Sequence, residues 1–425
     1  MSIKICFFIF SIFILTQLNA EDSINCKSVI YSEKPNHLYK YSNTSTITTT
    51  RIILKEGNFL LDEICESEKD KIFNSDNVTV LGRNYSRILD VKNINTNIYS
   101  NSKNDVAILN IKNKKNIFIH GVNFKNVKVS LTNSNFIKFF KVGFINAHHI
   151  EPDLKTKNAH FLSVVRSNFI TVSKSFFYRN SDYYLGKGIT IYDSNDFILS
   201  GTEFIGHFIT AVNGGVGSSL NFNKNIEIKN NTITRSKIYP PIITKENSAF
   251  KNLEDHGIYI WGFDNLLIKS NIIKGWSPTD AGGAIKIRNG KNATVSYNTL
   301  NDSGIYLYAY FQPKGDFNLN PKLISKKEDV VSPLEFSNVK VHNNKITQSI
   351  DNNCLTYSKN FYSENNQIKY IKSDYVNNTK EIFYYKINLL NRLDKQVEGE
   401  IEIFGNTLIN CNKQIPNVTR IKDSN

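Results

Sequence analysis

The chain has 425 residues, of which 52 are lysine or arginine and 38 are aspartate or glutamate, so its formal net charge is +14. This charge favours anionic partners, whether acidic polysaccharide, a membrane surface or nucleic acid, but in a lysine- and asparagine-rich sequence it does not choose between them. Beyond the first 20 residues no segment approaches the roughly 20 apolar residues of a membrane-spanning helix, so we expect no later membrane span.

The first 20 residues have the pattern of a secretory signal peptide. Lys4 precedes an apolar run that is too short for a comfortable membrane span, and the small residue Ala20 precedes a polar stretch. This order of charged, apolar and small residues is typical of a segment that is removed during export. We therefore expect cleavage near Ala20 and a secreted, extracellular protein that is not associated with a membrane.

Four cysteines follow this segment, namely Cys26, Cys65, Cys354 and Cys411. An even number in an exported chain allows two disulfides, and nearness in the sequence favours Cys26–Cys65 and Cys354–Cys411 among the three possible pairings. Sequons for N-glycosylation occur at Asn43, Asn77, Asn84, Asn230, Asn292, Asn301, Asn377 and Asn417. A eukaryotic secretory pathway would add glycans at such sites and make the protein a glycoprotein.

A short pattern recurs along most of the chain. NIFIHGVNFKN begins at Asn116, NIEIKNNTITRS at Asn225 and NVKVHNNKITQS at Asn338. Each copy is an alternating strand, then a polar corner with Asn or Gly, then a second apolar pair. Because no long stretch has helical periodicity, the pattern predicts a solenoid of parallel strands in which the corner asparagines stack from coil to coil.

A second series of strands lies between these copies. It includes GITIYD from Gly188, GIYIWG from Gly257, AIKIRN from Ala284 and GIYLYAY from Gly304. A β-sandwich would need hairpin turns of the Asn-Gly kind between its strands, and such turns are scarce. Two or three short strands per turn therefore predict an all-β chain folded as a right-handed parallel β-helix.

The repeats divide the chain into four predicted parts. Residues 1–20 are the signal peptide, and residues 21–110 are expected to form an N-terminal cap and the first coils, because a solenoid must close its apolar end. Residues 111–350 are expected to form the β-helix core, from which the segments 239–255 and 311–333 project as loops. Residues 351–425 are expected to hold the C-terminal coils with an insertion.

Alternation along the second series predicts which side chains face outward. In GIYIWG the two isoleucines face the core, and the same assignment holds for AIKIRN and GIYLYAY. The predicted outward column contains Tyr259 and Trp261, then Lys286 and Arg288, then Tyr306 and Tyr308, with Thr190 and Tyr192 on an earlier coil. Aromatic rings cover sugar rings and cations bind carboxylates, so the column predicts a cleft for an extended acidic sugar polymer.

The run HGIYIWG, GGAIKIRNG and GIYLY resembles the right-handed parallel β-helix polysaccharide lyases of the pectate-lyase-like superfamily. The nearest local likeness is to the alginate lyase and chondroitinase B group, in which a strand lysine removes the C5 proton of a uronate. Lys286 looks like that lysine. That group has an arginine one coil later, where this chain offers Tyr306 or Tyr308. The group's calcium ligands, Asn and Glu, precede the lysine, where this chain offers only Asp280.

β-Elimination at a uronate needs three groups, and the column can supply each. Arg288 or bound calcium can neutralise the C6 carboxylate. Lys286 can take the C5 proton if the neighbouring charge lowers its pKa. Tyr306, Tyr308 or His256 can protonate the departing oxygen. The residues expected to bind substrate are Tyr259, Trp261, Tyr192, Asp264 and Asp280. No cofactor is certain, and calcium is the one candidate.

Three other functions remain open. A glycoside hydrolase resembling the polygalacturonases is suggested by His256 followed by a Lys-x-Arg pair, although hydrolysis needs paired carboxylates that the preceding strands do not show. A C5-epimerase shares the proton abstraction. A non-catalytic adhesion protein that binds glycans would have a similar basic and aromatic surface. We expect a monomer with an acidic polysaccharide partner and, since no motif supports it, no nucleic acid.

Overall fold

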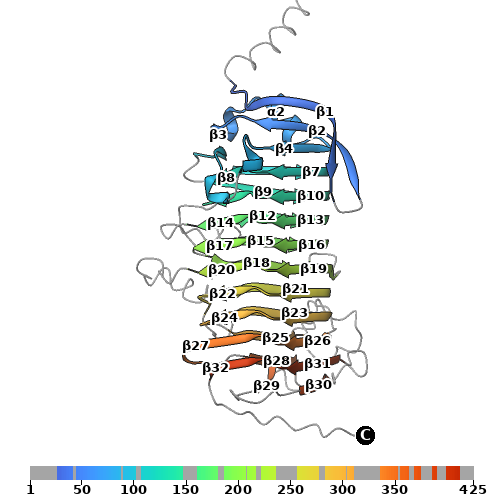
Figure 1. Cartoon of the computed structure of the whole chain (residues 1–425). Helices are drawn as coiled ribbons and strands as arrows, with labels where there is room; N and C mark the ends of the chain where they lie inside the picture. Colours follow the sequence, from blue (N-terminus) through green and yellow to red (C-terminus); the bar gives the residue numbers. More distant parts are fainter. Residues whose placement is uncertain are drawn as a thin grey trace, which may run out of the picture.

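The structure, a computed structural model, is a stack of β-strands along one axis (Figure 1). It describes residues 26–41, 45–87, 90–101, 107–146, 160–179, 186–206, 208–216, 222–235, 256–276, 283–302, 304–310, 336–352, 355–362, 368–374, 385–389 and 399–411. Within these ranges, no helix is both long and apolar enough to cross a membrane.

The strands of the stack form three faces, which we call A, B and C. Face A consists of β6 (Ala107–Lys112), β9 (Val127–Thr132), β12 (His160–Val165), β15 (Gly186–Tyr192), β18 (Phe208–Gly215), β25 (Ile305–Tyr310) and β28 (Leu355–Tyr362). Face B consists of β2 (Thr46–Leu54), β4 (Val78–Leu81), β7 (Lys115–His120), β10 (Asn135–Phe140), β13 (Asn168–Ser173), β16 (Asn195–Ser200), β19 (Asn223–Lys229), β26 (Phe336–His342) and β31 (Gly399–Phe404). The long strands β21 (His256–Lys269) and β23 (Gly283–Ser296) pass through the corner between these faces and join them in one sheet.

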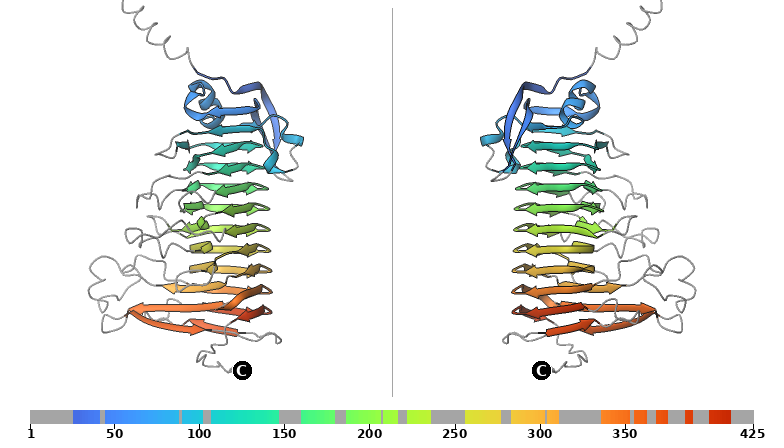
Figure 2. Two further views of the ribbon diagram at one scale, coloured as in Figure 1. Left: turned by 90° about the vertical axis from the view of Figure 1, so that its left-hand side faces the viewer. Right: turned by 90° about the vertical axis from the view of Figure 1, so that its right-hand side faces the viewer.

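Face C is a separate 11-stranded sheet. It consists of β3 (Gly57–Leu60), β5 (Thr96–Tyr99), β8 (Asn123–Lys125), β11 (Gly143–Ile145), β14 (Phe176–Arg179), β17 (Glu203–Gly206), β20 (Thr232–Arg235), β22 (Ile272–Lys274), β24 (Thr299–Asn301), β27 (Lys345–Asn352) and β32 (Thr407–Cys411). Within the stack, strands of successive coils pair in parallel, as β12 does with β15 and β21 with β23. The two side views in Figure 2 show the coils following one another regularly. The predicted parallel β-helix is confirmed.

The interior is apolar because side chains of each strand alternate between the two sides. On face A the inward side chains of successive coils stack in one column of Val129, Leu162, Ile189, Val212, Ile258, Ile285 and Ile305, all buried. On face C, phenylalanine rings stack in the same way, with centroid distances of 4.5 Å from Phe177 to both Phe144 and Phe204. Each fully buried side chain of this size contributes about 1.5–3 kcal/mol to folding.

A ladder of five asparagines, four of them buried, runs along the corner between faces B and C. Its members are Asn231, Asn271, Asn298, Asn344 and Asn406, and the amide oxygen of each accepts a hydrogen bond from the amide Nδ2 of the one before. The same Nδ2 group also donates to a backbone carbonyl, as Asn271 does to Ile228 at 2.9 Å. These bonds satisfy polar groups that would otherwise be buried without partners. The predicted stacking of corner asparagines is confirmed.

The corner between faces A and B needs a left-handed backbone in each coil. One recurring position there has positive φ, and further residues of this corner, such as Asn113, Asn133 and Arg166, have it too. The recurring position is occupied by Asn77, Asn116, Phe136, Phe169, Asp196, Asn225, Asn265, Asn292 and Asn338. Asn and Asp adopt this conformation most readily among residues with a side chain. The two phenylalanines do not, and their rings instead stack on each other with centroids 4.5 Å apart.

The N-terminal end of the stack is covered by irregular elements. Strand β1 (Ile30–Lys40) pairs antiparallel with β2, and helix α2 (Glu66–Phe73) lies beside it (Figure 1). Ile72 of α2 is fully buried, and the Tyr39 ring of β1 stacks on Phe118 of face B at 3.9 Å. The other described elements are η2 (Leu61–Glu63), η3 (Tyr85–Arg87), η4 (Val91–Asn93), β29 (Ile368–Asp374) and β30 (Tyr385–Leu389).

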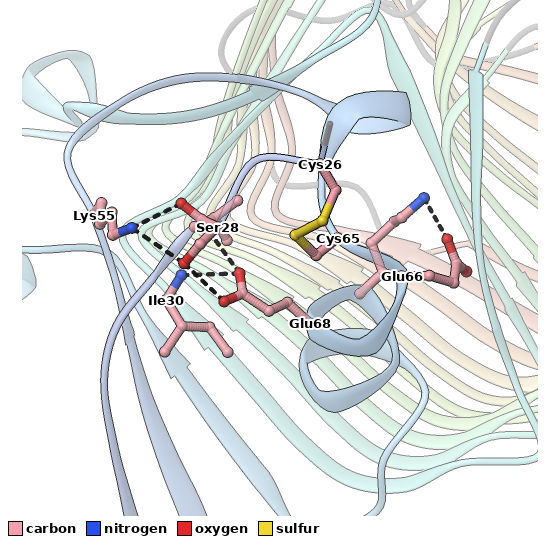
Figure 3. Close-up of a disulfide and its surroundings, with 9 residues drawn as sticks. Cys26, Ser28, Ile30, Lys55, Cys65, Glu66 and Glu68 are labelled. Atoms are coloured by element: carbon pink, nitrogen blue, oxygen red, sulfur yellow. Dashed lines mark hydrogen bonds and ion pairs between the residues drawn. A yellow bond between two sulfur atoms is a disulfide. The ribbon is translucent and has the colours of Figure 1, made fainter. Parts of the chain in front are cut away.

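The predicted disulfide between Cys26 and Cys65 is confirmed, and it ties the start of the described chain to the first turn of α2 (Figure 3). Beside it, the Glu68 carboxylate accepts hydrogen bonds from the Ser28 hydroxyl and from the two backbone N–H groups that follow Ser28. The other predicted disulfide lies outside the described residues, because Cys354 is not among them.

Replacing Cys26 and Cys65 together by serine is expected to destabilise this end of the stack. The two residues are separated by 39 positions, and a cross-link typically stabilises by about 2–4 kcal/mol because it restricts the unfolded chain. The midpoint of urea unfolding, measured by circular dichroism, should be lower for the double variant than for the wild type. The control is Lys55→Ala, which removes only exposed hydrogen bonds to Ser28. Equal midpoints for the double variant and the wild type would contradict the prediction.

Candidate functional site on face A

The outward side chains of face A form two parallel columns. The first contains Ser130, Ser163, Thr190, Asn213, Tyr259, Lys286 and Tyr306. The second contains Thr132, Val165, Tyr192 and Gly215 on the earlier coils and Trp261 and Arg288 on the later ones, and the register aligns Arg288 with Tyr308 of β25. The register therefore aligns the predicted outward residues of β21, β23 and β25, with neighbouring strands about 4.8 Å apart.

Lys286 lies between two tyrosines of the adjacent coils. Its Nζ atom is 5.4 Å from the ring centroid of Tyr259 and 5.0 Å from that of Tyr306. All three side chains are partly exposed. Because an ammonium group is attracted to the face of an aromatic ring, the two tyrosines hold this cation in place at the surface.

Arg288 is held in a similar way in the second column. Its guanidinium carbon lies 4.8 Å from the ring centroid of Trp261, and its Nη1 group donates a 3.4 Å hydrogen bond to the Tyr259 hydroxyl. Tyr259 therefore contacts both cations. Together with Tyr306 these side chains form one unit of five, which we call the cation pair and its aromatic supports: Lys286, Arg288, Tyr259, Tyr306 and Trp261.

Among the outward side chains of face A, Nε1 of Trp261 and Oγ1 of Thr190 are buried and have no hydrogen-bond partner within the described part of the protein. Buried polar groups in folded proteins nearly always have a partner, so each such atom needs an explanation. Both belong to outward side chains of face A, which is consistent with a polar ligand on this face.

Tyr192 is joined to the site through two residues that the sequence did not single out. The Asn213 amide donates a 2.8 Å hydrogen bond to the Tyr192 hydroxyl. A Cβ atom on Gly215 would lie 3.0 Å from Cε1 of Tyr192 and 3.6 Å from Cε3 of Trp261, so both rings lean over this glycine. Asn213 and Gly215 belong to β18, and their place between two aromatic residues depends on the register of the coils.

Basic groups continue along the N-terminal coils of face A. Burial, together with the nearby charges of Lys128, Lys187 and Arg179, lowers the pKa of His160 to about 3. His160 is therefore neutral near pH 7. These residues were not predicted as part of the site, because the mainly apolar strand HFLSVV, which begins at His160, gave no sign of a basic neighbourhood.

The remaining predicted site residues have different surroundings. His256 is fully buried, with its ring centroid 5.1 Å from that of Tyr259, so it does not reach the surface. Asp264 lies at the corner between faces A and B. Its carboxylate accepts a 2.9 Å hydrogen bond from the Asn292 amide and forms an ion pair with Lys291, with the Nζ and Oδ2 atoms 3.9 Å apart. Asp280 and the side chain of Tyr308 lie outside the described residues.

Calcium, the cofactor considered from the sequence, binds several oxygen ligands and favours carboxylates. Across the described ranges, no three His, Cys, Asp or Glu side chains gather in one place. The outward side chains around Lys286 are aromatic or cationic instead. These residues do not fit a calcium site, and no step below uses calcium.

By sequence, the chain matches one family model but no curated protein. A family model described as the right handed beta helix region matches residues 160–312, which include strands β12 to β25.

Several solved structures resemble the chain in shape. The A-module of the mannuronan C-5 epimerase AlgE6 from Azotobacter vinelandii has 12% identity and a TM-score of 0.43, with 73% of this chain and 84% of that chain covered. The surface protein and adhesin PfbA of Streptococcus pneumoniae has 12% identity and a TM-score of 0.44, with coverage of 85% and 90%. The alginate lyase AlyF-OU02 has 10% identity and a TM-score of 0.43, with coverage of 86% and 80%.

Such low identities and TM-scores say nothing about the substrate or activity of this chain. The fold itself follows from the parallel register of the coils and from the family match. The chain is a right-handed parallel β-helix, the architecture of the pectate-lyase-like superfamily.

Proposed function

We propose that this protein is secreted, binds an acidic, uronate-containing polysaccharide on face A and cleaves it by β-elimination. The observation that carries the proposal is the cation pair and its aromatic supports, Lys286 and Arg288 held on the rings of Tyr259, Tyr306 and Trp261. Two fixed cations at a partly exposed surface suit the carboxylates of a uronan. A guanidinium can bind a carboxylate through two parallel hydrogen bonds.

The proposed reaction uses three of these residues. Arg288 binds the C6 carboxylate and stabilises the negative charge that develops when C5 loses its proton. The Lys286 amine takes that proton, the C5 electron pair forms the C4–C5 double bond, and the bond from C4 to the departing oxygen breaks. The Tyr306 hydroxyl, beside Lys286, gives its proton to this oxygen. His256 has no role in this scheme because it is fully buried.

Two opposing effects act on the proposed base. The tyrosine rings on both sides of Lys286 favour its charged ammonium form. The positive charge of Arg288 on the same strand disfavours that form. Only the neutral amine can accept the C5 proton, so the balance between these effects decides whether Lys286 is a base or only a binding group.

A second candidate is therefore a non-catalytic glycan-binding protein. It is favoured by the same cation–π contacts, because a lysine that stays charged binds a carboxylate and removes no proton. A C5-epimerase would use the same proton abstraction and return the proton to the other face of the sugar. A hydrolase has less support, since the outward columns of the described face A strands contain no carboxylate pair.

The function is tested by incubating the purified protein with alginate, pectate, glucuronan and chondroitin sulfates. We expect the ultraviolet absorbance of the unsaturated C4–C5 product to rise with one of these polymers. Incorporation of deuterium from heavy water at C5 without new absorbance would indicate epimerisation, and reducing ends without absorbance would indicate hydrolysis. Binding of a uronan with none of these products would reject the lyase and support the glycan-binding alternative.

A further inference from the structure

The positive charge of the chain is concentrated in the coils from β6 to β14. Residues 107–146 and 160–179 contain ten lysine and arginine residues and no aspartate or glutamate, whereas the whole chain has a net charge of +14. The basic residues are Lys112, Lys114, Lys115, Lys125, Lys128, Lys138, Lys141, Arg166, Lys174 and Arg179. A surface with charges of one sign attracts polymers of the opposite sign over distances near the Debye length, about 8–10 Å at ordinary salt.

Three of these lysines, on or next to face B, lie beside two aromatic rings. The Nζ atoms of Lys141 and Lys174 lie 5.6 Å and 5.8 Å from the ring centroid of Phe140. Lys138, two residues before Phe140 on β10, places its Nζ atom 5.8 Å from the ring centroid of Tyr39 in β1. The rings hold the ammonium groups in place, as they do around Lys286 on face A.

The register places two of these positive charges side by side. Phe140 is aligned with Ser173, so Lys141 and Lys174, the residues that follow them, occupy the same position in neighbouring coils. Like charges in directly opposite positions of adjacent strands repel each other. Burial also lowers the pKa of Lys138, which means that its charged form is disfavoured where it stands. A bound anion would relieve both effects.

We propose that Lys138, Lys141 and Lys174, with Phe140, form a second binding surface for an acidic polysaccharide chain on face B. This surface, which we call the β10–β13 surface, is on a different face from the cation pair. It is also separated from the cation pair by four coil steps from β13 to β23, about 19 Å along the axis at the usual strand spacing. The proposal shares a ligand class with the proposed function but none of its residues.

An acidic polysaccharide fits this surface better than a nucleic acid does. The disulfide between Cys26 and Cys65 is typical of proteins of oxidising compartments, where acidic polysaccharides are the abundant polyanions. Proteins that bind single strands also offer open aromatic faces on which bases stack. The Phe140 ring instead has two ammonium groups beside it. A second surface of this kind would keep the protein on its polymer while the face A site engages another segment.

The test compares two triple variants that lose the same charge. Lys138→Ala/Lys141→Ala/Lys174→Ala removes the β10–β13 surface. Lys229→Ala/Lys269→Ala/Lys340→Ala removes three lysines of the same face further along the stack, where Glu227 and Glu402 are the ion-pair partners of two of them. Dissociation constants are measured for alginate, polygalacturonate, heparin and duplex DNA at several salt concentrations. Lys141→Gln/Lys174→Gln, with long neutral side chains, is a milder second variant for the case that the triple variant does not fold.

We expect the β10–β13 variants to bind the wild type's preferred polysaccharide about tenfold more weakly and with a smaller salt dependence, because fewer counter-ions are released. The control variant should lose much less affinity. Equal losses in both triple variants, no loss in either, a loss for DNA alone, or no binding of any of the three polysaccharides by the wild type would each overturn the proposal.

The outcome is separate from that of the proposed function. Lys286→Ala/Arg288→Ala leaves the β10–β13 surface intact, so this double variant should still bind the polymer and should lose affinity when Lys138, Lys141 and Lys174 are also replaced. That result would support the second surface even if the protein cleaves no uronan. Complete loss of binding in the face A double variant would reject it.

Discussion

Lys286→Ala is expected to lower kcat on the uronan that the wild type cleaves by about 10²–10⁴-fold, the usual contribution of a positioned general base. The reason is that Lys286 is the proposed acceptor of the C5 proton. Its Nζ atom is held in place by two tyrosine rings, whose centroids lie 5.0 Å and 5.4 Å away. Initial rates of formation of the unsaturated product, measured at saturating polymer, would show the effect.

Lys286→Arg separates a base from a binding group. Arginine keeps the positive charge and the contact with the rings, but it does not give up its proton near neutral pH. If Lys286 is the base, the arginine variant should bind the polymer and be as inactive as the alanine variant. If it only binds a carboxylate, the arginine variant should keep most of the activity. Full activity of Lys286→Ala would remove this residue from the mechanism.

Asn271→Ala is expected to destabilise the protein by about 3 kcal/mol, because it leaves several buried polar groups without partners. The Asn271 side chain accepts bonds from the backbone N–H and the side chain of Asn231, and it donates to Ile228 and to Asn298. Alanine replaces none of these bonds. Urea unfolding monitored by circular dichroism measures the change.

Asn110→Ala is the matched control for this prediction. Asn110 is an exposed outward residue of β6, in extended backbone, so its loss should change the free energy of unfolding by less than about 0.5 kcal/mol. Similar unfolding midpoints for the two variants would mean that the ladder contributes little to stability. Reversible unfolding with a single transition is needed for the comparison of free energies.

The fold could be predicted because its two signals are local. A period of two assigns each side chain to the core or the outside, and the corner asparagines mark where the chain turns. The same alternation predicted that Ile258 and Ile285 are buried and that Tyr259 and Lys286 face outward in register. A shift of one residue along a strand would have exchanged the buried and the outward side chains, so the alternating pattern strongly constrains which residues face outward.

The details of the site depend on contacts between coils, which the sequence does not specify. His256 belongs to the same motif as Tyr259, yet it is fully buried at the start of its strand. Asp264 was predicted to bind substrate, and the structure adds contacts of its carboxylate with Asn292 and Lys291 at the corner. Gly215 was not predicted as a site residue, because the role of this glycine depends on the two aromatic rings from other strands that lie over it.

Because of the asparagine ladder, the packing of the coils does not depend on the length of the loops between them. Along the chain its members Asn231, Asn271, Asn298, Asn344 and Asn406 are 40, 27, 46 and 62 residues apart, yet each makes the same bond to the next. Because every amide is both donor and acceptor, no position in the ladder is unique. Evolution can therefore insert long loops at the other corners, or duplicate an entire coil, without disturbing the neighbours. The substrate range of such a protein can change while its framework stays the same.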